Sequence, residues 1–321
     1  MNEENNNVSK QRLAAMPVWL KKIMYLILAL STFAVHIVLF SYICSLMADY
    51  LQFGVELPMF TALRIYNVFE IALFILFTVL YYVTMRIFFI DKKFEMKDPA
   101  LPRKLKLKEK GLWWRSIVTG CGIYGVSFVW VQFLGKVFAN INAETAGFFS
   151  SLIRMIQEES AMILGMGGAA PGAQEIPLID LLLYFMAPTI VMPIAEEFVF
   201  RGVAFNALEK VFPKWLPVIG SAIIFGVGHW SIVNGSYAFI MGIVFALLYK
   251  KTRNIFAVCI AHLTNNLMAT IQDLIAIFTG KEDINRVIDW VCVGVAVVMV
   301  VVLFDLFRRL SAKKEEAASA A

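Results

Sequence analysis

The chain has 321 residues, of which 60% are hydrophobic and 17% are charged, and its mean hydropathy is +0.73. Because roughly a quarter of the residues in an ordinary soluble domain are charged, these values exclude a water-soluble globular fold. The formal net charge of +5 comes from basic residues in short runs between apolar segments. It therefore indicates orientation in a lipid bilayer, and we expect no nucleic-acid partner.

The apolar residues gather in blocks of about 18 to 25, long enough to cross the hydrocarbon core of a bilayer as helices. The predicted spans are 23–46, 66–89, 112–137, a long helix within 178–208, 216–230, 238–249, 255–278 and 288–307. The fifth and sixth are short enough to be tilted or to be joined by a partly buried loop. The predicted fold class is all-α, a polytopic transmembrane helical bundle of about eight spans.

Basic loops alternate with the spans and predict the orientation of the chain. With eight spans, the basic segments all fall on one side of the membrane, which places both termini in the cytoplasm. We expect the membrane to be a bacterial cell membrane. We divide the chain into N-terminal spans 1–3 with a basic loop and an outer connection (1–175), a core of spans 4–8 (176–310) and a polar cytoplasmic tail (311–321). The outer connection holds an amphipathic stretch at 148–164, which is either an interfacial helix or part of a plain loop.

Ionisable side chains inside a bilayer cost several kcal/mol and are therefore candidates for function. The polar residues that cluster in the later spans are Glu196, Glu197 and Arg201 in the fourth, His229 in the fifth, and His262, Asn265 and Asn266 in the seventh. His36 in the first span has no partner at a recognisable spacing, so we interpret it as structural. Glu70 in the second span either lines a cavity or pairs with Arg64.

Helical spacing separates the two glutamates of the fourth span. Glu197 and Arg201 are four residues apart, so they share a helix face and are expected to form an ion pair. Glu196 is rotated by about 100° from Glu197 and is not matched to Arg201 in the same way. We therefore predict that Glu196 is the carboxylate free for acid–base chemistry. A packing network of all three residues is the structural alternative.

The two histidines of the later spans are expected to approach Glu196. His262 and Asn266 share a face of the seventh helix, and Phe225 and His229 share a face of the fifth. At 1.5 Å per residue from the nearest basic turn, Glu196 and His229 lie about 21 Å deep and His262 about 13 Å deep. Within the uncertainty that tilt introduces, these depths overlap, so the sequence predicts one site inside the bilayer.

A carboxylate, two imidazoles and an amide can activate water for hydrolysis of an amide, and two versions of the chemistry are open. In one, His229, His262 and Asn266 are candidate ligands of a zinc ion, while Glu196 is the general base. In the other, Glu196 and one histidine activate water without a metal, and the second histidine and Asn266 stabilise the oxyanion.

Three ordered motifs carry a resemblance to a known family: Glu196-Glu197-x-x-x-Arg201, Phe225-x-x-x-His229 and His262-x-x-x-Asn266. They resemble the CPBP family of intramembrane proteases, which includes the type II CAAX prenyl endopeptidases and the bacteriocin-processing or Abi proteases. The resemblance covers about 176–278. It implies that Glu196 activates water, that His229, His262 and Asn266 complete the site, and that Glu197, Arg201 and Phe225 support it.

The resemblance also implies a peptide or a membrane-anchored protein as substrate, and in eukaryotic members this is a prenylated CAAX protein. Two other functions are open from the sequence. One is a non-catalytic membrane regulator or bacteriocin self-immunity protein that keeps the site as a relic. The other is a proton-coupled carrier, against which stands the absence of an inverted repeat in the sequence. Nothing in the sequence specifies an oligomeric state.

Overall fold

The fold is helical throughout the part of the chain that the computed structural model describes, which is residues 16–90, 111–142, 150–163, 177–279 and 282–319. Within those residues, seven helices are long and apolar enough to cross a membrane, and an eighth apolar helix is shorter. The prediction of an all-α polytopic bundle is confirmed, and the chain is an integral membrane protein.

The first half of the chain supplies three spans and one surface helix. The first span is continuous and consists of α2 (Val18–Ala34), η1 (Val35–Leu39), α3 (Phe40–Asp49) and η2 (Tyr50–Gly54), where η denotes a π-helical segment. It is followed by α4 (Met59–Met85) with η3 (Arg86–Ile90), then α5 (Leu112–Ala139) and α6 (Ser150–Ile163). Residues 150–163 of the amphipathic stretch are thus helical, and 143–149 and 164–176 lie outside the described residues.

The second half holds the fourth span and four further helices. The fourth span is α7 (Leu178–Met186), η7 (Ala187–Val191), α8 (Met192–Glu197), η8 (Phe198–Phe205) and α9 (Asn206–Val211). It is followed by α10 (Leu216–Val227), α11 (Ile232–Thr252), α12 (Ile255–Thr279) and α13 (Glu282–Ser319).

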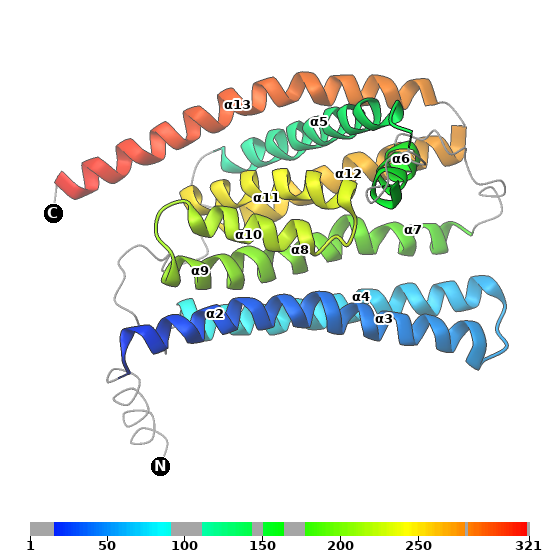
Figure 1. Ribbon diagram of the computed structural model, residues 1–321, viewed down its shortest axis with the longest axis horizontal. Coiled ribbons are helices and arrows are strands. Elements are labelled where there is room, and N and C mark those ends of the chain that lie inside the picture. Colours follow the sequence, from blue (N-terminus) through cyan, green and yellow to red (C-terminus); the bar gives the residue numbers. More distant parts are fainter. Residues whose placement is uncertain (1–15, 91–110, 143–149, 164–176, 280–281, 320–321) are drawn as a thin grey trace, which may run out of the picture.

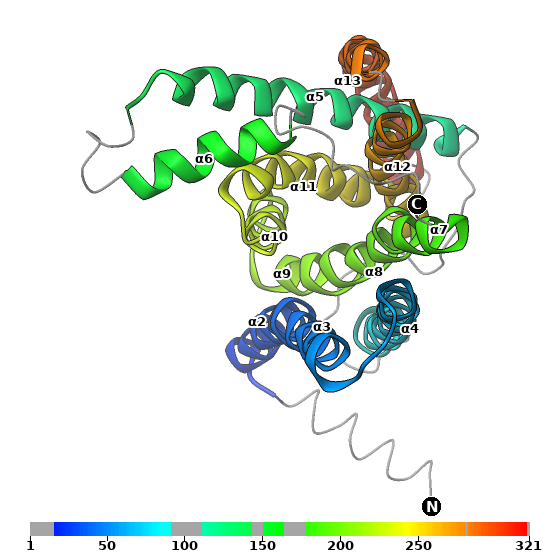
Figure 2. The same ribbon diagram turned by 90° about the vertical axis from the view of Figure 1, so that its right-hand side faces the viewer.

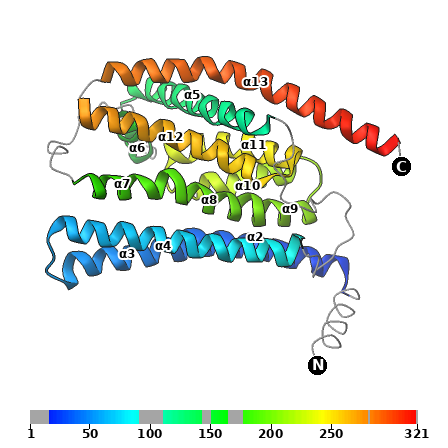
Figure 3. The ribbon, with the colours of Figure 1, turned by 180° about the vertical axis from the view of Figure 1, so that it is seen from behind.

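The helices form three layers. Figures 1 and 3 show α2, α3 and α4 as one outer layer, the fourth span with α10, α11 and α12 in the middle, and α5 with α13 on the opposite side. Figure 2 shows α7 to α12 arranged around a common centre, while α5 and α6 run lengthwise across the view. The predicted site residues lie on the middle helices, except His229, which lies in the turn after α10.

α5 belongs to the first half of the sequence but packs tightly against the second half. Gly120 lies so close to α12 that an added Cβ would be 2.2 Å from the carbonyl oxygen of Ala261. A Cβ on Gly125 would be 2.4 Å from backbone atoms of Cys292 in α13. Small residues of this kind let helix backbones approach each other in a membrane, where packing drives association.

The fifth span differs from its prediction. We expected a helix over 216–230, but α10 ends at Val227 after 12 residues, and His229 lies in the turn before α11. The turn is tight because Gly226 and Gly235 bring the two backbones together; a Cβ on either would lie within 2.8 Å of the other's carbonyl oxygen. The sixth span is longer than predicted, because α11 has 21 residues.

Candidate active site

The fourth span is irregular where it carries the two glutamates. Pro188 lies in η7 and Pro193 at the start of α8, and the π-helical η8 follows immediately after Glu197. A proline inside a helix removes a backbone hydrogen bond, and π-helical turns are frequent at functional sites. Glu196 and Glu197 thus end a short α-helical stretch of 6 residues between two π-helical segments.

Glu197 and Arg201 form the predicted ion pair. Arg201 Nη1 donates to Glu197 Oε1 at 2.8 Å, and both side chains are fully buried. The guanidinium also lies 4.6 Å from the ring centre of Phe225 and 5.5 Å from that of Phe245. Aromatic faces stabilise a desolvated cation, so Arg201 is held on several sides.

A second bond of Glu197 was not predicted from the sequence. Its Oε1 lies 2.8 Å from Nδ1 of His262, which is 2% exposed. A carboxylate on Nδ1 fixes the orientation of the imidazole and stabilises its protonated form. Glu197 therefore joins Arg201 in the fourth span to His262 in α12.

Glu196 faces the other nitrogen of the same imidazole. Its Oε2 lies 3.5 Å from His262 Nε2. Its side chain is 11% exposed, whereas that of Glu197 is 0% exposed. The predicted pairing of Glu197 with Arg201 is confirmed, and Glu196 is the more exposed of the two carboxylates.

His229 reaches the site from the turn after α10. Its Nδ1 lies 2.8 Å from the carbonyl oxygen of Phe225 and must carry the proton of that hydrogen bond. In the neutral ring, Nε2 is then a proton acceptor. The side chain is partly buried and its ring lies 4.8 Å from that of Phe225.

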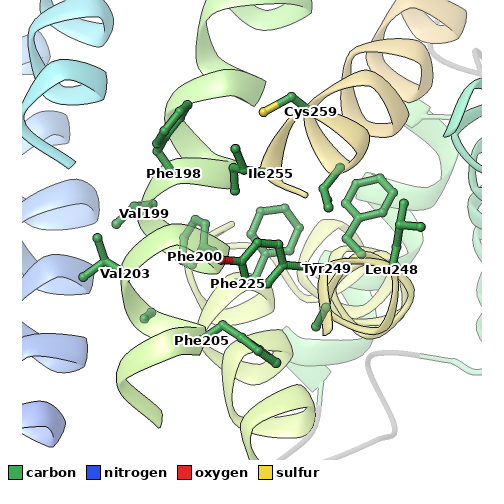
Figure 4. Close-up of a cluster of buried hydrophobic side chains, with 14 of the residues drawn as sticks. Phe198, Val199, Phe200, Val203, Phe205, Phe225, Leu248, Tyr249, Ile255 and Cys259 are labelled. Atoms are coloured by element: carbon green, nitrogen blue, oxygen red, sulfur yellow. The ribbon is translucent and has the colours of Figure 1, made fainter. Parts of the chain in front are cut away.

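Phe225 is the common neighbour of the charged and imidazole groups. Its ring is fully buried and lies 5.9 Å from the ring of His262 and 4.9 Å from that of Phe200. Figure 4 shows Phe225 and Phe200 within the cluster of buried apolar side chains on η8, α10, α11 and α12. These apolar walls exclude water and strengthen electrostatic interactions in the site.

Asn266 lies one turn after His262 and contacts the fourth span. Its Nδ2 donates to the carbonyl oxygen of Pro188 at 2.7 Å, and its Oδ1 accepts from Nδ2 of Asn265 at 3.1 Å. Five of the residues therefore form one connected group, which consists of Glu196, Glu197, Arg201, His262 and Phe225. His229 contacts Phe225 of this group, and Asn266 contacts Pro188 in the fourth span.

A catalytic zinc ion normally has three protein ligands, and the candidates here are His229, His262 and Asn266. Within the described ranges, no three His, Cys, Asp or Glu side chains are grouped closely enough to hold a metal. Nδ1 of His262 is bonded to Glu197, which leaves Nε2 as the nitrogen that could bind a metal. Nδ2 and Oδ1 of Asn266 each make one hydrogen bond. As arranged, the described residues do not form a three-ligand zinc site.

Two other membrane residues have partners that the sequence did not predict. Arg64 donates two hydrogen bonds, of 2.7 and 3.0 Å, to Asp180 at the start of α7, and not to Glu70. His36 lies 3.3 Å from the hydroxyl of Tyr81 and is 4% exposed, so its interpretation as a packed residue agrees with its surroundings. Both contacts join two different spans, so residue spacing within one helix could not predict them.

Comparison with known proteins agrees with the motif analysis. Residues 178–268, which contain all three motifs, match the family described as type II CAAX prenyl endopeptidase Rce1-like. The chain is also 31% identical over 135 residues to the "Putative membrane peptidase YdiL" of Bacillus subtilis (strain 168). That match covers 40% of this chain and 54% of the relative, so it spans about half of the relative's length. No solved structure matches the chain significantly.

Proposed function

We propose that the chain is an intramembrane endopeptidase of the CPBP type, which hydrolyses peptides or membrane-anchored proteins within the bilayer. The match of residues 178–268 to the Rce1-like family and the likeness to a relative named as a membrane peptidase support the proposal. The observation that carries the proposal is the pair of carboxylates on one imidazole. Glu197 lies 2.8 Å from Nδ1 of His262 and Glu196 lies 3.5 Å from Nε2. Glu197 is fully buried and bonded to the Arg201 guanidinium, whereas the side chain of Glu196 is 11% exposed.

In the proposed reaction, Glu196 accepts a proton from a water molecule, whose oxygen attacks the carbonyl carbon of the scissile peptide bond. His229 assists, because its Nδ1 donates to Phe225 and its Nε2 is left as an acceptor. The new C–O bond forms, the C–N bond breaks, and the proton held by Glu196 passes to the leaving amine. The products are a carboxylic acid and an amine, which become a carboxylate and an ammonium ion when the acid gives its proton to the amine, and no other reactant is consumed.

The oxyanion of the tetrahedral intermediate needs hydrogen-bond donors. In the proposal, His262 donates to the oxyanion from Nε2, and Glu197 on Nδ1 holds the ring in place. The second N–H of the Asn266 amide is the other donor, since one N–H is bound to Pro188. Glu197 and Arg201 orient His262 from behind and contact neither water nor substrate.

The proposed activity is tested with purified protein in lipid nanodiscs, incubated with a library of membrane-derived, lipidated and prenylated peptides. Mass spectrometry identifies new termini, and the Glu196→Gln protein is the blank. Products formed by the wild type and not by the blank support the endopeptidase and define its substrate class. If the wild type yields the same termini as the blank, the proposal fails and a non-catalytic regulator becomes the better account.

We further propose that catalysis requires no bound zinc. Elemental analysis of the purified wild type is expected to give well below one zinc per chain, with activity retained after dialysis against a chelator. The reason is that, in the part of the chain that the structure describes, no three His, Cys, Asp or Glu side chains are grouped closely enough to hold a metal. One zinc per chain that disappears in both His229→Ala and His262→Ala would contradict this and favour the zinc-bound version.

We also propose that both termini are cytoplasmic. Basic residues of the described chain at one end of the bundle support this orientation under the positive-inside rule: Lys21, Lys22, Lys210, Lys214, Lys250, Lys251, Arg253, Arg308 and Arg309. A periplasmic reporter enzyme fused after Ala321 should be inactive, and the same reporter inserted in the outer connection should be active. The reverse pattern would show that the orientation is wrong.

A further inference from the structure

The starting point is a backbone carbonyl in the fourth span. Pro188 belongs to η7, and in a π-helical turn its carbonyl would accept from the N–H five residues on. That residue is Pro193, which has no N–H. An unpaired carbonyl inside a bilayer costs several kcal/mol. Asn266 satisfies it from α12 with a bond of 2.7 Å.

This bond works in only one of the two orientations of the Asn266 amide. A rotation by 180° would place Oδ1 against the Pro188 carbonyl, so that two acceptors would face each other. It would also turn the second N–H of Asn266 away from the site. The proposed oxyanion donor therefore depends on which way this amide points.

Asn265 contacts the oxygen of that amide. Its Nδ2 donates to Asn266 Oδ1 at 3.1 Å, and the residue is 9% exposed. The Asn266 amide thus has a hydrogen-bond donor, Asn265, next to its Oδ1 and an acceptor, the Pro188 carbonyl, next to its Nδ2. Together, the two partners of Asn266 select one orientation.

Asn265 also lowers the stability of the fold, and packing alone does not require an asparagine at this position. Its own Oδ1 is buried, and among the described residues it has no hydrogen-bond partner. An orphaned buried acceptor costs about 1–3 kcal/mol. Leucine has the same number and branching of side-chain heavy atoms and would avoid this cost at a buried position in a membrane helix. A residue that costs stability at the edge of a site indicates a role in the site.

We propose that Asn265 is a positioning residue that holds the Asn266 amide with its free N–H toward the oxyanion of the peptide substrate. The inference deepens the proposed function and depends on it. Asn265 itself contacts neither substrate nor water in this role, because its effect passes through Asn266. The bond of Asn265 acts on the transition state, in which the oxyanion exists, and not on binding of the substrate.

The test is steady-state kinetics of Asn265→Leu in nanodiscs with a peptide that the wild type cleaves. Loss of an oxyanion donor costs about 100- to 1,000-fold in kcat. Because the Asn266 amide is released and not removed, we expect a fall of about 10- to 50-fold in kcat with KM unchanged. The midpoint of thermal unfolding should stay the same or rise, since the orphaned acceptor is gone. Asn265→Gln, which keeps the N–H donor, should recover part of the kcat.

Asn206 provides the matched control. It is 2% exposed and has a buried Oδ1 without a partner, but it donates to Gly202 and Tyr249, away from Asn266. Asn206→Leu should change stability and leave kcat per folded molecule near the wild-type value.

The outcomes separate this inference from the proposed function. If Asn265→Leu keeps kcat within about twofold of the wild type while Asn266→Ala loses activity, the positioning role is wrong and the endopeptidase stands. A fall in kcat that only follows the loss of folded protein, without recovery in Asn265→Gln, also overturns the positioning role. If neither the wild type nor any variant cleaves the peptides, the proposed function itself has failed.

Discussion

Replacing Glu196 with glutamine is expected to lower kcat for peptide hydrolysis by about 1,000-fold or more while leaving the fold intact. General-base catalysis contributes about 100- to 10,000-fold, and glutamine has the same shape but cannot accept the proton of water. The carboxylate is 11% exposed and lies 3.5 Å from His262, so an amide in its place keeps the packing and removes the base.

The measurement is single-turnover cleavage by protein in nanodiscs, with the unfolding midpoint as a check on folding. Glu70→Gln is the matched control, because Glu70 is also a partly buried carboxylic acid in a membrane helix but lies on α4. The control should keep wild-type activity. If Glu196→Gln retains more than about a tenth of wild-type kcat, the effect is below that of a general base and the assignment of Glu196 is wrong.

The contacts inside one helix could be predicted from the sequence. The pairing of Glu197 with Arg201 follows from a spacing of four residues, which holds here although η8 is π-helical. The same spacing placed Glu196 on a different side of the helix. Membrane class and helical architecture follow from composition, because a bilayer permits few folds for so apolar a chain.

The contacts between helices could not be predicted, because they depend on register and tilt. Depth counting placed His262 about 8 Å nearer to the inner side than Glu196, using 1.5 Å per residue. In the structure, the two side chains are 3.5 Å apart. Counting assumed straight helices at right angles to the membrane and basic turns at one level. The interrupted fourth span does not meet that assumption.

The end of α10 shows a second limit. The spacing of Phe225 and His229 suggested one helix face, and their rings do lie 4.8 Å apart. The helix nevertheless ends at Val227, and the Nδ1 of His229 bonds to the Phe225 carbonyl. Apolar residues continue through the turn, so hydropathy gave no signal of the end. The glycines at 226 and 235 were the available signal, since they permit the close approach of α10 and α11.

The buried charges of Glu197 and Arg201 lead to the second large expected effect, which is on stability. Glu197→Gln should lower the free energy of unfolding by about 3–5 kcal/mol, because it leaves a buried cation without its counter-charge. Arg201→Met should have a smaller cost, since Glu197 keeps His262 as a partner at 2.8 Å. The double variant Glu197→Gln/Arg201→Met should recover much of the stability, because neither buried charge remains.

In this set of two single variants and one double variant, the activity should not follow the stability. The double variant removes the carboxylate from Nδ1 of His262, so the ring loses the partner that orients it and the activity stays low even where the fold recovers. Unfolding titrations in mixed micelles give the free energies, and peptide cleavage gives kcat. Asp283→Asn is the control for stability, because its ion pair with Arg286 is exposed and should contribute nothing measurable. Recovery of activity together with stability would contradict the role of Glu197, whereas recovery of stability alone would separate the ion pair that stabilises the fold from the carboxylate that orients His262.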